Sequence, residues 1–395
     1  MFKKDKRIDY ITYISNPAIK SRQVYPNPAA ESKVYYIANK IAAAESVQIV
    51  TFARSTISGK RFPETVVNMD HRVKFKALRD AEPQNLILHK LYALNWHLKA
   101  FRELLCHNKE DTIIAYHSLE DAFELWIAKK ICGFKLILEL EEIYQDVVDC
   151  SKDKAYWERK VISSADAYIL ATEALSKQIP AGRPYIVING TYRSEPPRNV
   201  RFDDDKIHCV YAGTFDPTKG GAAAAAAAAA FLPQNYHVHI LGFGTDEQIE
   251  NLKKQIAEVQ KTTKCTLTYD GLKSGEEYIQ FLQKCHIGLC TQVPDAKYTE
   301  TSFPSKVLVY LANGLRVLSV RIPAVKQSDV GDMLFYYDEQ KPEKIAEAIQ
   351  SIDVTLPYDS RERLNALDIK AFEDIEKLLD SENERKDHGK IYAGS

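Results

Sequence analysis

The sequence predicts an α/β protein made of two doubly wound, Rossmann-like parallel-sheet domains that face a cleft. Short apolar runs alternate with helical segments in both halves of the chain, which is the pattern of parallel sheets covered by helices on both faces. The 395 residues also exceed one ordinary core, because domains usually hold about 100–200 residues. In such domains, ligands bind at the carboxyl ends of the strands.

The first half predicts one sheet with right-handed crossovers. Its strands are expected at residues 8–15, 47–52, 86–88, 112–116, 135–140, 167–171 and 186–188, and its helices at 31–45, 119–131 and 154–164. A further helix is expected over 89–105, where one stripe contains Leu91, Leu94, Leu98, Phe101 and Leu105. This stripe suits a helix that lies on a membrane surface, but we favour an ordinary helix whose stripe faces the core.

The second half repeats the alternation after a polar segment. Residues 191–205 contain Pro196-Pro197 and dense charge, which is typical of a domain boundary. We expect an N-terminal domain over 1–195, a linker over 196–206, a C-terminal domain over 207–368, and a last helix and tail over 369–395 that cross back to the N-terminal domain. Strands are expected at 208–212, 237–241, 267–269, 287–290 and 316–320, and helices at 221–232, 246–259, 276–284, 304–312, 342–352 and 369–379.

Composition excludes several classes of protein. No run of about 18 apolar residues is present to span a membrane, and the basic N-terminus lacks the apolar segment of a secretory signal. The seven cysteines show neither CxxC nor zinc spacing, which favours reduced thiols in a cytoplasmic protein. The triplet Asp203–Asp205 lies in the linker and predicts solvated charge. We therefore expect no metal and no cofactor.

Charge is distributed unevenly along the chain. Residues 1–109 carry 19 Lys+Arg and 9 Asp+Glu, a net charge of +10, although the whole chain carries −1. Such a surplus predicts an anionic partner, either a phosphorylated acceptor or an anionic membrane surface. Solvation of exposed helices explains the same charge. We expect no nucleic-acid partner.

Two segments in the second half follow a predicted strand and precede a helix. In the first, the strand ends at Gly213 and Lys219-Gly220 open the helix, and a helix N-terminus with a lysine suits a phosphate. In the second, Gly242 and Gly244 form a GxG turn, where a ligand can approach the backbone closely. Plain strand-to-helix connections explain both segments as well.

The third segment begins with clustered hydroxyls, Thr301, Ser302 and Ser305, around Pro304. Proline suits the first turn of a helix, and Lys306 falls in that same turn. A cation so early in a helix opposes the helix dipole unless an anion lies beside it. The pattern therefore indicates an anion site.

Together, these segments resemble the C-terminal domain of retaining GT-B glycosyltransferases. The resemblance is to family four in particular, which includes mannosyl- and glucosyltransferases of bacterial surface polysaccharides. It covers roughly residues 205–350, where the aG…KG, GxG and DG elements and the run PxKxxxYLAxGxxV occur in the family's order. The first half resembles the family only loosely, through Tyr116–Ser118, Ser164–Thr172 and Val187–Gly190.

The resemblance implies transfer of a sugar, with retention and without a metal, from a nucleotide-diphosphate-sugar to a glycan or lipid-linked acceptor. It implies that Lys219 contacts the donor diphosphate and that His117 touches the transferred sugar. From its position and charge, we expect Lys306 to supply a second cation on the diphosphate. The implied donor-binding residues are Gly213, Thr214, Lys219, Gly220, Gly242, Gly244, Thr301, Ser302, Ser305 and Lys306. A basic N-terminal domain would suit peripheral association with the inner membrane.

Two positions depart from the family. Thr214 stands where the family often has an arginine, and Val309 stands where a glutamate commonly holds the ribose. Valine cannot accept a hydrogen bond from ribose. One alternative is therefore a catalytically degenerate GT-B subunit that acts as partner or scaffold of another transferase. A GT-B nucleotide-sugar epimerase, using His117 with Glu139, Glu141 and Glu142, is the other. Lys219 and Lys306 favour the transferase.

Overall fold

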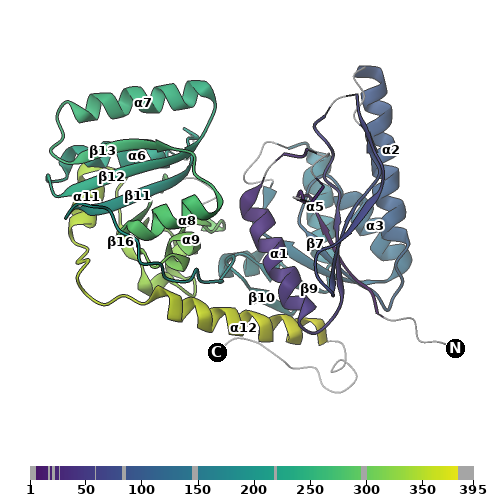
Figure 1. Cartoon of the computed structure of the whole chain (residues 1–395). Coiled ribbons are helices and arrows are strands. Elements are labelled where there is room, and N and C mark those ends of the chain that lie inside the picture. Colours follow the sequence, from purple (N-terminus) through teal and green to yellow (C-terminus); the bar gives the residue numbers. More distant parts are fainter. Residues whose placement is uncertain are drawn as a thin grey trace. The chain divides into compact units, whose positions relative to one another are not determined.

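The computed structural model describes residues 6–16, 18–19, 23–25, 27–57, 59–81, 86–144, 150–217, 220–294 and 300–380, without the side chains of 86–90. The chain divides into two compact units (Figure 1). Unit 1 comprises the described residues up to Ile188 and those from Ala371 onward, and unit 2 comprises Asn189–Lys370. Each unit is a parallel sheet with helices on both faces.

In the described part of unit 1, the main sheet has the strand order β10-β9-β8-β7-β1-β2-β5-β4. All neighbours are parallel except β4, which runs antiparallel to β5 at one edge. The strands are β1 (Ile8–Thr12), β2 (Val47–Thr51), β4 (Thr65–Asn68), β5 (Val73–Ala77), β7 (Thr112–Tyr116), β8 (Lys135–Leu140), β9 (Ala167–Leu170) and β10 (Tyr185–Val187), with a separate pair β3 (Arg61–Phe62) and β6 (Asp80–Ala81). Central strands such as β1 and β8 are buried throughout, as a sheet covered on both faces requires.

The helices of unit 1 bury one face each against this sheet. They are α1 (Pro28–Ala42), α2 (Leu86–Leu105), α3 (Ala122–Cys132), α5 (Lys152–Ser164) and the 3-10 helix η1 (Glu173–Gln178). Helix α1 begins where the Asn27 side chain accepts a hydrogen bond from the Ala30 amide, with Pro28 in its first turn. The main core cluster joins the sheet residue Leu138 to Trp96 of α2 and Leu125 of α3.

Helix α2 corrects two predictions. Residues 86–88, expected as a strand, are its first turn. The leucine stripe expected to face the core is exposed instead: the exposed fractions are 60% for Leu91, 60% for Leu94, 54% for Leu98 and 37% for Leu105. The buried face consists of Trp96, Ala100 and Leu104. Apolar residues surround most of this helix, so periodicity allowed two stripes, and the one with the large aromatic ring was buried.

In the described part of unit 2, the sheet is wholly parallel, with the order β13-β12-β11-β14-β15-β16. Its strands are β11 (Ile207–Thr214), β12 (Tyr236–Phe243), β13 (Thr266–Gly271), β14 (Ile287–Cys290), β15 (Arg316–Val320) and β16 (Phe335–Tyr337). Its helices are α6 (Gly221–Ala228), η2 (Ala229–Phe231), α7 (Asp246–Gln260), α8 (Gly275–Lys284), α9 (Lys306–Ala312), α10 (Pro323–Lys326), η4 (Gly331–Met333) and α11 (Pro342–Gln350). Helix α9 begins two residues later than expected.

The segment predicted as a linker belongs to unit 2. The guanidinium of Arg198 binds the Glu276 carboxylate, with a closest distance of 2.7 Å, and the ring of Phe202 stacks on His208. The last helix, α12 (Ser360–Asp380), begins nine residues before its predicted start, within unit 2, and its later turns belong to unit 1. There, the Lys135 ammonium donates to the carbonyls of Leu378 and Leu379, which places a cation at the helix C-terminus.

None of the helices in the described ranges combines the length and the apolar character that a membrane span requires.

Candidate functional site

The first part of the candidate site is the carboxyl edge of the unit 2 sheet, where β11 and β12 end on paired glycines. Gly213 and Gly242 are register partners. A Cβ atom on Gly242 would lie 1.7 Å from the carbonyl oxygen of Gly213, and Gly242 has a φ of 140°. The close approach of these two strands therefore requires glycine at position 242, before any ligand is considered.

Lys306 lies across the other side of Gly213. A Cβ atom at Gly213 would be 2.2 Å from Cε and 2.7 Å from Nζ of Lys306. The missing side chain at 213 thus makes the space that the lysine occupies. The ammonium lies 5.0 Å from the centre of the Tyr211 ring, a cation–π distance.

The Lys306 ammonium has no counter-ion in the part of the chain that the structure describes. Burial lowers its pKa, and the interaction with Cys290 acts in the opposite direction. A sheltered cation without a carboxylate is destabilising, because the aromatic ring replaces little of the lost hydration. The carboxyl edge is therefore complementary to an anion.

Helix α6 begins beside this lysine. Gly220 precedes it in the left-handed conformation, with a φ of 62°, and no side chain caps the first turn. The Thr291 hydroxyl donates to the Gly221 carbonyl at 2.7 Å, and the Tyr211 hydroxyl donates to the Thr214 carbonyl at 3.0 Å. A Cβ on Gly221 would lie 2.8 Å from the Tyr211 ring, so this ring fills the space between the helix start and Lys306.

The remaining residues predicted for donor binding are placed less centrally. Lys219 lies outside the described residues. Gly244 packs against Gln248, whose side chain forms a capping box with Thr245, so the first turn of α7 is already capped. Thr301 and Ser302 are partly exposed ahead of α9, and Ser305 is exposed and its side chain accepts no capping hydrogen bond. The structure therefore brings together Gly213, Thr214, Gly220, Gly242 and Lys306.

Two tyrosines in this group had no role in the sequence-based prediction. Tyr211 supports Lys306, as described above. The Tyr310 hydroxyl accepts the Ala212 amide at 2.8 Å, and its ring lies 2.4 Å from where a Cβ on Gly288 would be. Tyr310 thus fixes α9, which carries Lys306, against β11 and β14. Both tyrosines belong to the motifs that carry the family resemblance, and that was the available signal.

His117 follows β7 in unit 1 and is only 1% exposed. Its backbone amide donates to the Glu139 carbonyl, and its ring packs on Tyr144 with 5.1 Å between ring centres. Burial lowers the pKa of His117 to about 4, although a carboxylate oxygen of Glu158 lies 3.3 Å from Nε2. In this arrangement, His117 is a neutral, enclosed ring.

A buried acidic cluster lies next to His117. The Tyr10 hydroxyl donates to the Glu139 carboxylate, and Lys33 forms an ion pair with Glu141 while lying 3.6 Å from Glu139. Burial raises the pKa of Glu139 to about 7. This carboxyl can therefore exchange a proton near neutral pH. The sequence offered Glu139 and Glu141 only in connection with the epimerase alternative.

Comparison with known proteins identifies the fold. No family model and no curated protein matches the chain. Solved structures do match over nearly its whole length. The apo structure of OtsA has a TM-score of 0.65 at 11% identity, covering 98% of this chain and 100% of that one. The chain has the GT-B fold.

Two further structures agree with this assignment. The α,α-trehalose 6-phosphate synthase of Burkholderia multivorans has a TM-score of 0.62 at 11% identity, with coverage of 98% and 100%. HepE of Anabaena, solved with UDP-glucose, has a TM-score of 0.63 at 14% identity, with coverage of 95% and 99%. These identities support the fold, and with it the predicted α/β class of two Rossmann-like domains.

Proposed function

We propose that this protein transfers a sugar from a nucleotide-diphosphate-sugar to a glycan or lipid-linked acceptor, with retention and without a metal or other cofactor. The observation that carries the proposal is the Lys306 ammonium, which lies over Gly213 at the carboxyl edge of the sheet and has no counter-ion among the residues that the structure describes. Resemblance to family four and structural similarity to HepE bound to UDP-glucose support the same donor class.

In this proposal, Lys306 binds the donor diphosphate and stabilises the negative charge that develops on it as the sugar leaves. The uncapped start of α6 at Gly220 offers backbone amides to the same phosphates. Lys219 supplies the basic residue that the family has on the diphosphate, and Lys306 compensates for Thr214, where the family often has arginine. For His117 to touch the transferred sugar, the Tyr144 ring that covers it has to move aside.

A thermal-shift panel tests this function. Wild-type protein and Lys306→Met are mixed with UDP, GDP, ADP and their common sugars, with and without EDTA. A ligand at a hundredfold excess over its Kd stabilises the folded state by about 2.7 kcal/mol. We expect one nucleotide to raise the unfolding temperature of wild type, regardless of EDTA, and to lose that effect in Lys306→Met.

Lys261→Met is the matched control, because Lys261 is an exposed lysine at the C-terminal end of α7, in an ion pair with Glu258. It should respond to the nucleotide as wild type does. If no nucleotide shifts the wild-type protein, the donor site is not functional. The degenerate-subunit alternative, which Val309 motivates, would then replace the transferase.

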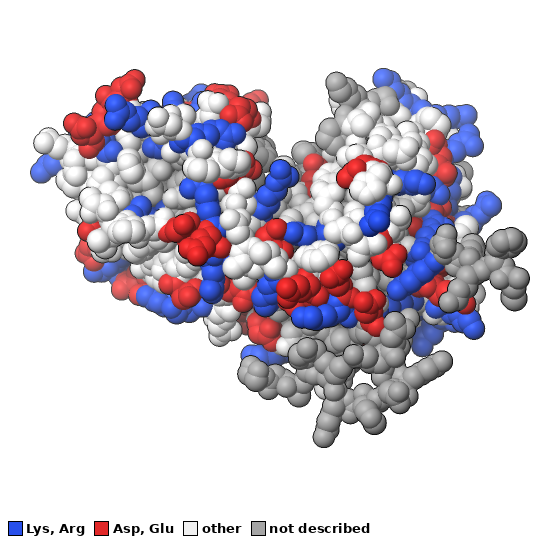
Figure 2. All heavy atoms as spheres, turned by 60° about the horizontal axis from the view of Figure 1, so that its bottom comes forward, with Lys and Arg blue, Asp and Glu red and all other residues white. Residues whose placement is uncertain are grey.

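We further propose that the protein works at the cytoplasmic face of a membrane, where a lipid-linked acceptor is found, and that α2 makes the contact. Leu91, Leu94, Leu98 and Leu105 form its exposed stripe, and Arg102 lies on the same exposed side. Leucines beside basic residues suit the interface of an anionic bilayer. Basic and acidic side chains are mixed on the face shown in Figure 2, so the leucines, rather than a basic patch, support this proposal.

Sedimentation with vesicles tests the contact. Wild type should bind phosphatidylglycerol-containing vesicles more strongly than purely phosphatidylcholine ones, and Leu94→Glu with Leu98→Glu should reduce binding at least tenfold without unfolding the protein. Leu272→Glu is the control, since Leu272 is equally exposed on unit 2. Equal vesicle binding by the double variant and by wild type would contradict this role of α2.

A further inference from the structure

Three histidines meet at the amino end of the unit 2 sheet, away from the carboxyl edge just described. His208 comes from β11, and His237 and His239 come from β12. His208 and His237 are register partners, and His239 lies two residues further on, so all three project from one face. Gly213 lies five positions beyond His208 on β11, a distance of about 17 Å along an extended strand.

Two of the three rings donate an N–H group to a carboxylate oxygen. Nε2 of His208 lies 2.7 Å from a carboxylate oxygen of Asp204, and Nδ1 of His239 lies 3.0 Å from one of Asp270. An ionised carboxylate only accepts hydrogen bonds, so these two nitrogens carry the protons. In a neutral imidazole, the opposite nitrogen then presents a lone pair.

These two lone pairs point at each other. Nδ1 of His208 and Nε2 of His239 are 2.9 Å apart, with both rings at most 2% exposed. Two acceptors at this distance repel unless a positive species lies between them. The arrangement therefore calls for either a shared proton or a metal ion.

His237 supplies a third lone pair. The Thr268 hydroxyl donates to Asp270 at 2.8 Å, so it accepts from Nε2 of His237 at 3.0 Å. Nδ1 of His237 is left with its lone pair. The ligand atoms of the three histidines all lie within 4.8 Å of one another. A single proton serves two of these nitrogens, whereas a metal ion serves all three.

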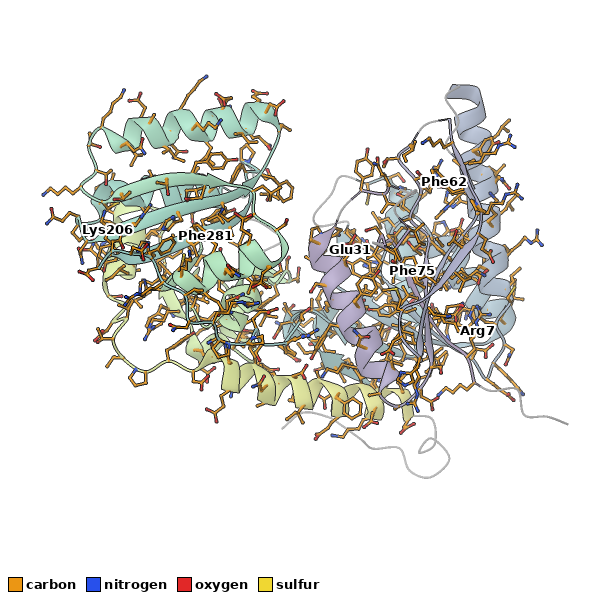
Figure 3. The ribbon with its side chains drawn as sticks, in the orientation of Figure 1. Arg7, Glu31, Phe62, Phe75, Lys206 and Phe281 are labelled. Atoms are coloured by element: carbon orange, nitrogen blue, oxygen red, sulfur yellow. The ribbon has the colours of Figure 1, made fainter. Side chains whose placement is uncertain are left out.

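The surroundings match those of protein metal sites. Metal-bound histidines usually hold their second nitrogen on a carboxylate or another oxygen, as Asp204, Asp270 and Thr268 provide here. Phe202 stacks on His208 and His239 with ring centres 4.0 Å and 5.0 Å away, and Phe281 of α8, labelled in Figure 3, meets His239 edge-on at 5.1 Å. This apolar cover keeps water from two of the ligands.

We propose that His208, His237 and His239 bind a divalent transition-metal ion, with Zn²⁺ as the expected occupant. Imidazole nitrogens suit zinc at about 2.0–2.1 Å, which in a tetrahedral site separates two ligand nitrogens by about 3.3 Å. The 2.9 Å distance between Nδ1 of His208 and Nε2 of His239 has to widen by a few tenths of an ångström. The partly exposed His237 ring has to turn toward the ion. The ion would fasten β11 to β12 and, through the hydrogen bonds of Thr268 and Asp270, to β13, and its role would be structural.

The sequence contained a signal that spacing rules for zinc did not capture. His237 and His239 form an HxH pair on a strand, and this spacing places both rings on one face. The third ligand and both carboxylates come from other strands or from the segment ahead of β11. The Asp203–Asp205 triplet, expected to be solvated, supplies one of those carboxylates through Asp204.

Metal titration of full-length protein, free of any histidine tag and stripped with EDTA, tests the site. We expect one Zn²⁺ per chain by calorimetry and elemental analysis, a higher unfolding temperature with Zn²⁺, and the visible absorption of four-coordinate Co²⁺ when cobalt replaces it. His239→Gln and His237→Asn should each weaken Zn²⁺ binding at least tenfold.

His237→Asn keeps the test decisive if the more buried variant fails to fold, because His237 is the most accessible of the three. His286→Asn is the matched control: Nδ1 of His286 accepts the His208 amide at 3.0 Å, and asparagine can accept in its place. It should bind Zn²⁺ as wild type does. Absence of stoichiometric Zn²⁺ uptake, or uptake that folded His237→Asn retains in full, would overturn the proposal.

Discussion

The two ends of the unit 2 sheet present opposite problems of charge. At the carboxyl edge, the Lys306 ammonium lies against Gly213 and Tyr211, and no carboxylate of the described residues pairs with it. At the amino edge, lone pairs of His208 and His239 face each other, with carboxylates behind them. One edge is complementary to an anion and the other to a cation.

This difference shows how a partner can be inferred from what a buried group lacks. Protein interiors normally pair a buried charge or satisfy a buried polar atom, so an unpaired one needs a reason. At the carboxyl edge, the reason fits the proposed nucleotide diphosphate, since α6 begins beside the ammonium without a side-chain cap. At the amino edge, it fits a metal ion, because three nitrogens converge.

The largest effect is expected from Gly242→Ala, which tests whether the carboxyl edge depends on its paired glycines. The new Cβ would lie 1.7 Å from the Gly213 carbonyl oxygen, an overlap with backbone that side-chain movement cannot relieve. We expect a loss of at least about 4 kcal/mol in the free energy of unfolding, measured by denaturant titration. Gly271→Ala, also at a positive φ but with nothing within 4 Å, should cost only about 1 kcal/mol. Similar losses in both variants would show that the close strand approach is not as described.

His117, a single buried histidine of unit 1, provides a comparison for the three histidines at the amino edge of the unit 2 sheet. Burial lowers the pKa of His117 to about 4, against about 6.5 when unfolded. The neutral ring therefore favours the folded state above pH 6.5, and this contribution is lost as pH falls from 6.5 toward 4. Over that window, wild type should lose about 3 kcal/mol more stability than His117→Asn, measured from unfolding curves at several pH values. Parallel pH profiles for the two proteins would contradict the buried, neutral state of His117.

The smallest effect is expected from Lys306→Met in the absence of ligand. The uncharged side chain removes an enclosed cation whose pKa is lowered by burial, so stability at pH 7 should rise by about 1 kcal/mol, read as a higher unfolding temperature. Lys261→Met, on the exposed surface, should leave the unfolding temperature unchanged. If Lys306→Met were clearly less stable than Lys261→Met, the ammonium would have a stabilising partner within the protein.

The sequence predicted the alternation of strands and helices well because buried parallel strands are continuous apolar runs. The sequence was least informative about which face of an element is buried where apolar residues surround that element. Helix α2 shows this: its leucine stripe and its Trp96 stripe have the same period, and only packing decides which one is buried. The short strands β3, β6 and β16 were missed because two or three residues carry no periodic signal, and β4 and β5 at one edge of the unit 1 sheet were missed as well.

The site was predictable where one motif supplies its parts and not where several strands do. Gly213 and Lys306 stand in motifs whose chemistry can be interpreted alone, and the structure places them in contact. Tyr211 lies two positions before Gly213 in the sequence, but its support of Lys306 depends on the fold. The histidine cluster needs β11, β12 and β13 to be paired in register before its members are neighbours.

The most direct test of the central claim compares nucleoside, monophosphate and diphosphate binding to wild type and Lys306→Met by calorimetry. The base is the one that the thermal-shift panel selects. If Lys306 binds the diphosphate, wild type should gain affinity with each added phosphate, and Lys306→Met should lose at least tenfold of that gain, about 1.4 kcal/mol, while binding the nucleoside equally. An equal gain from phosphates in both proteins would contradict the assignment of the carboxyl edge as the diphosphate site.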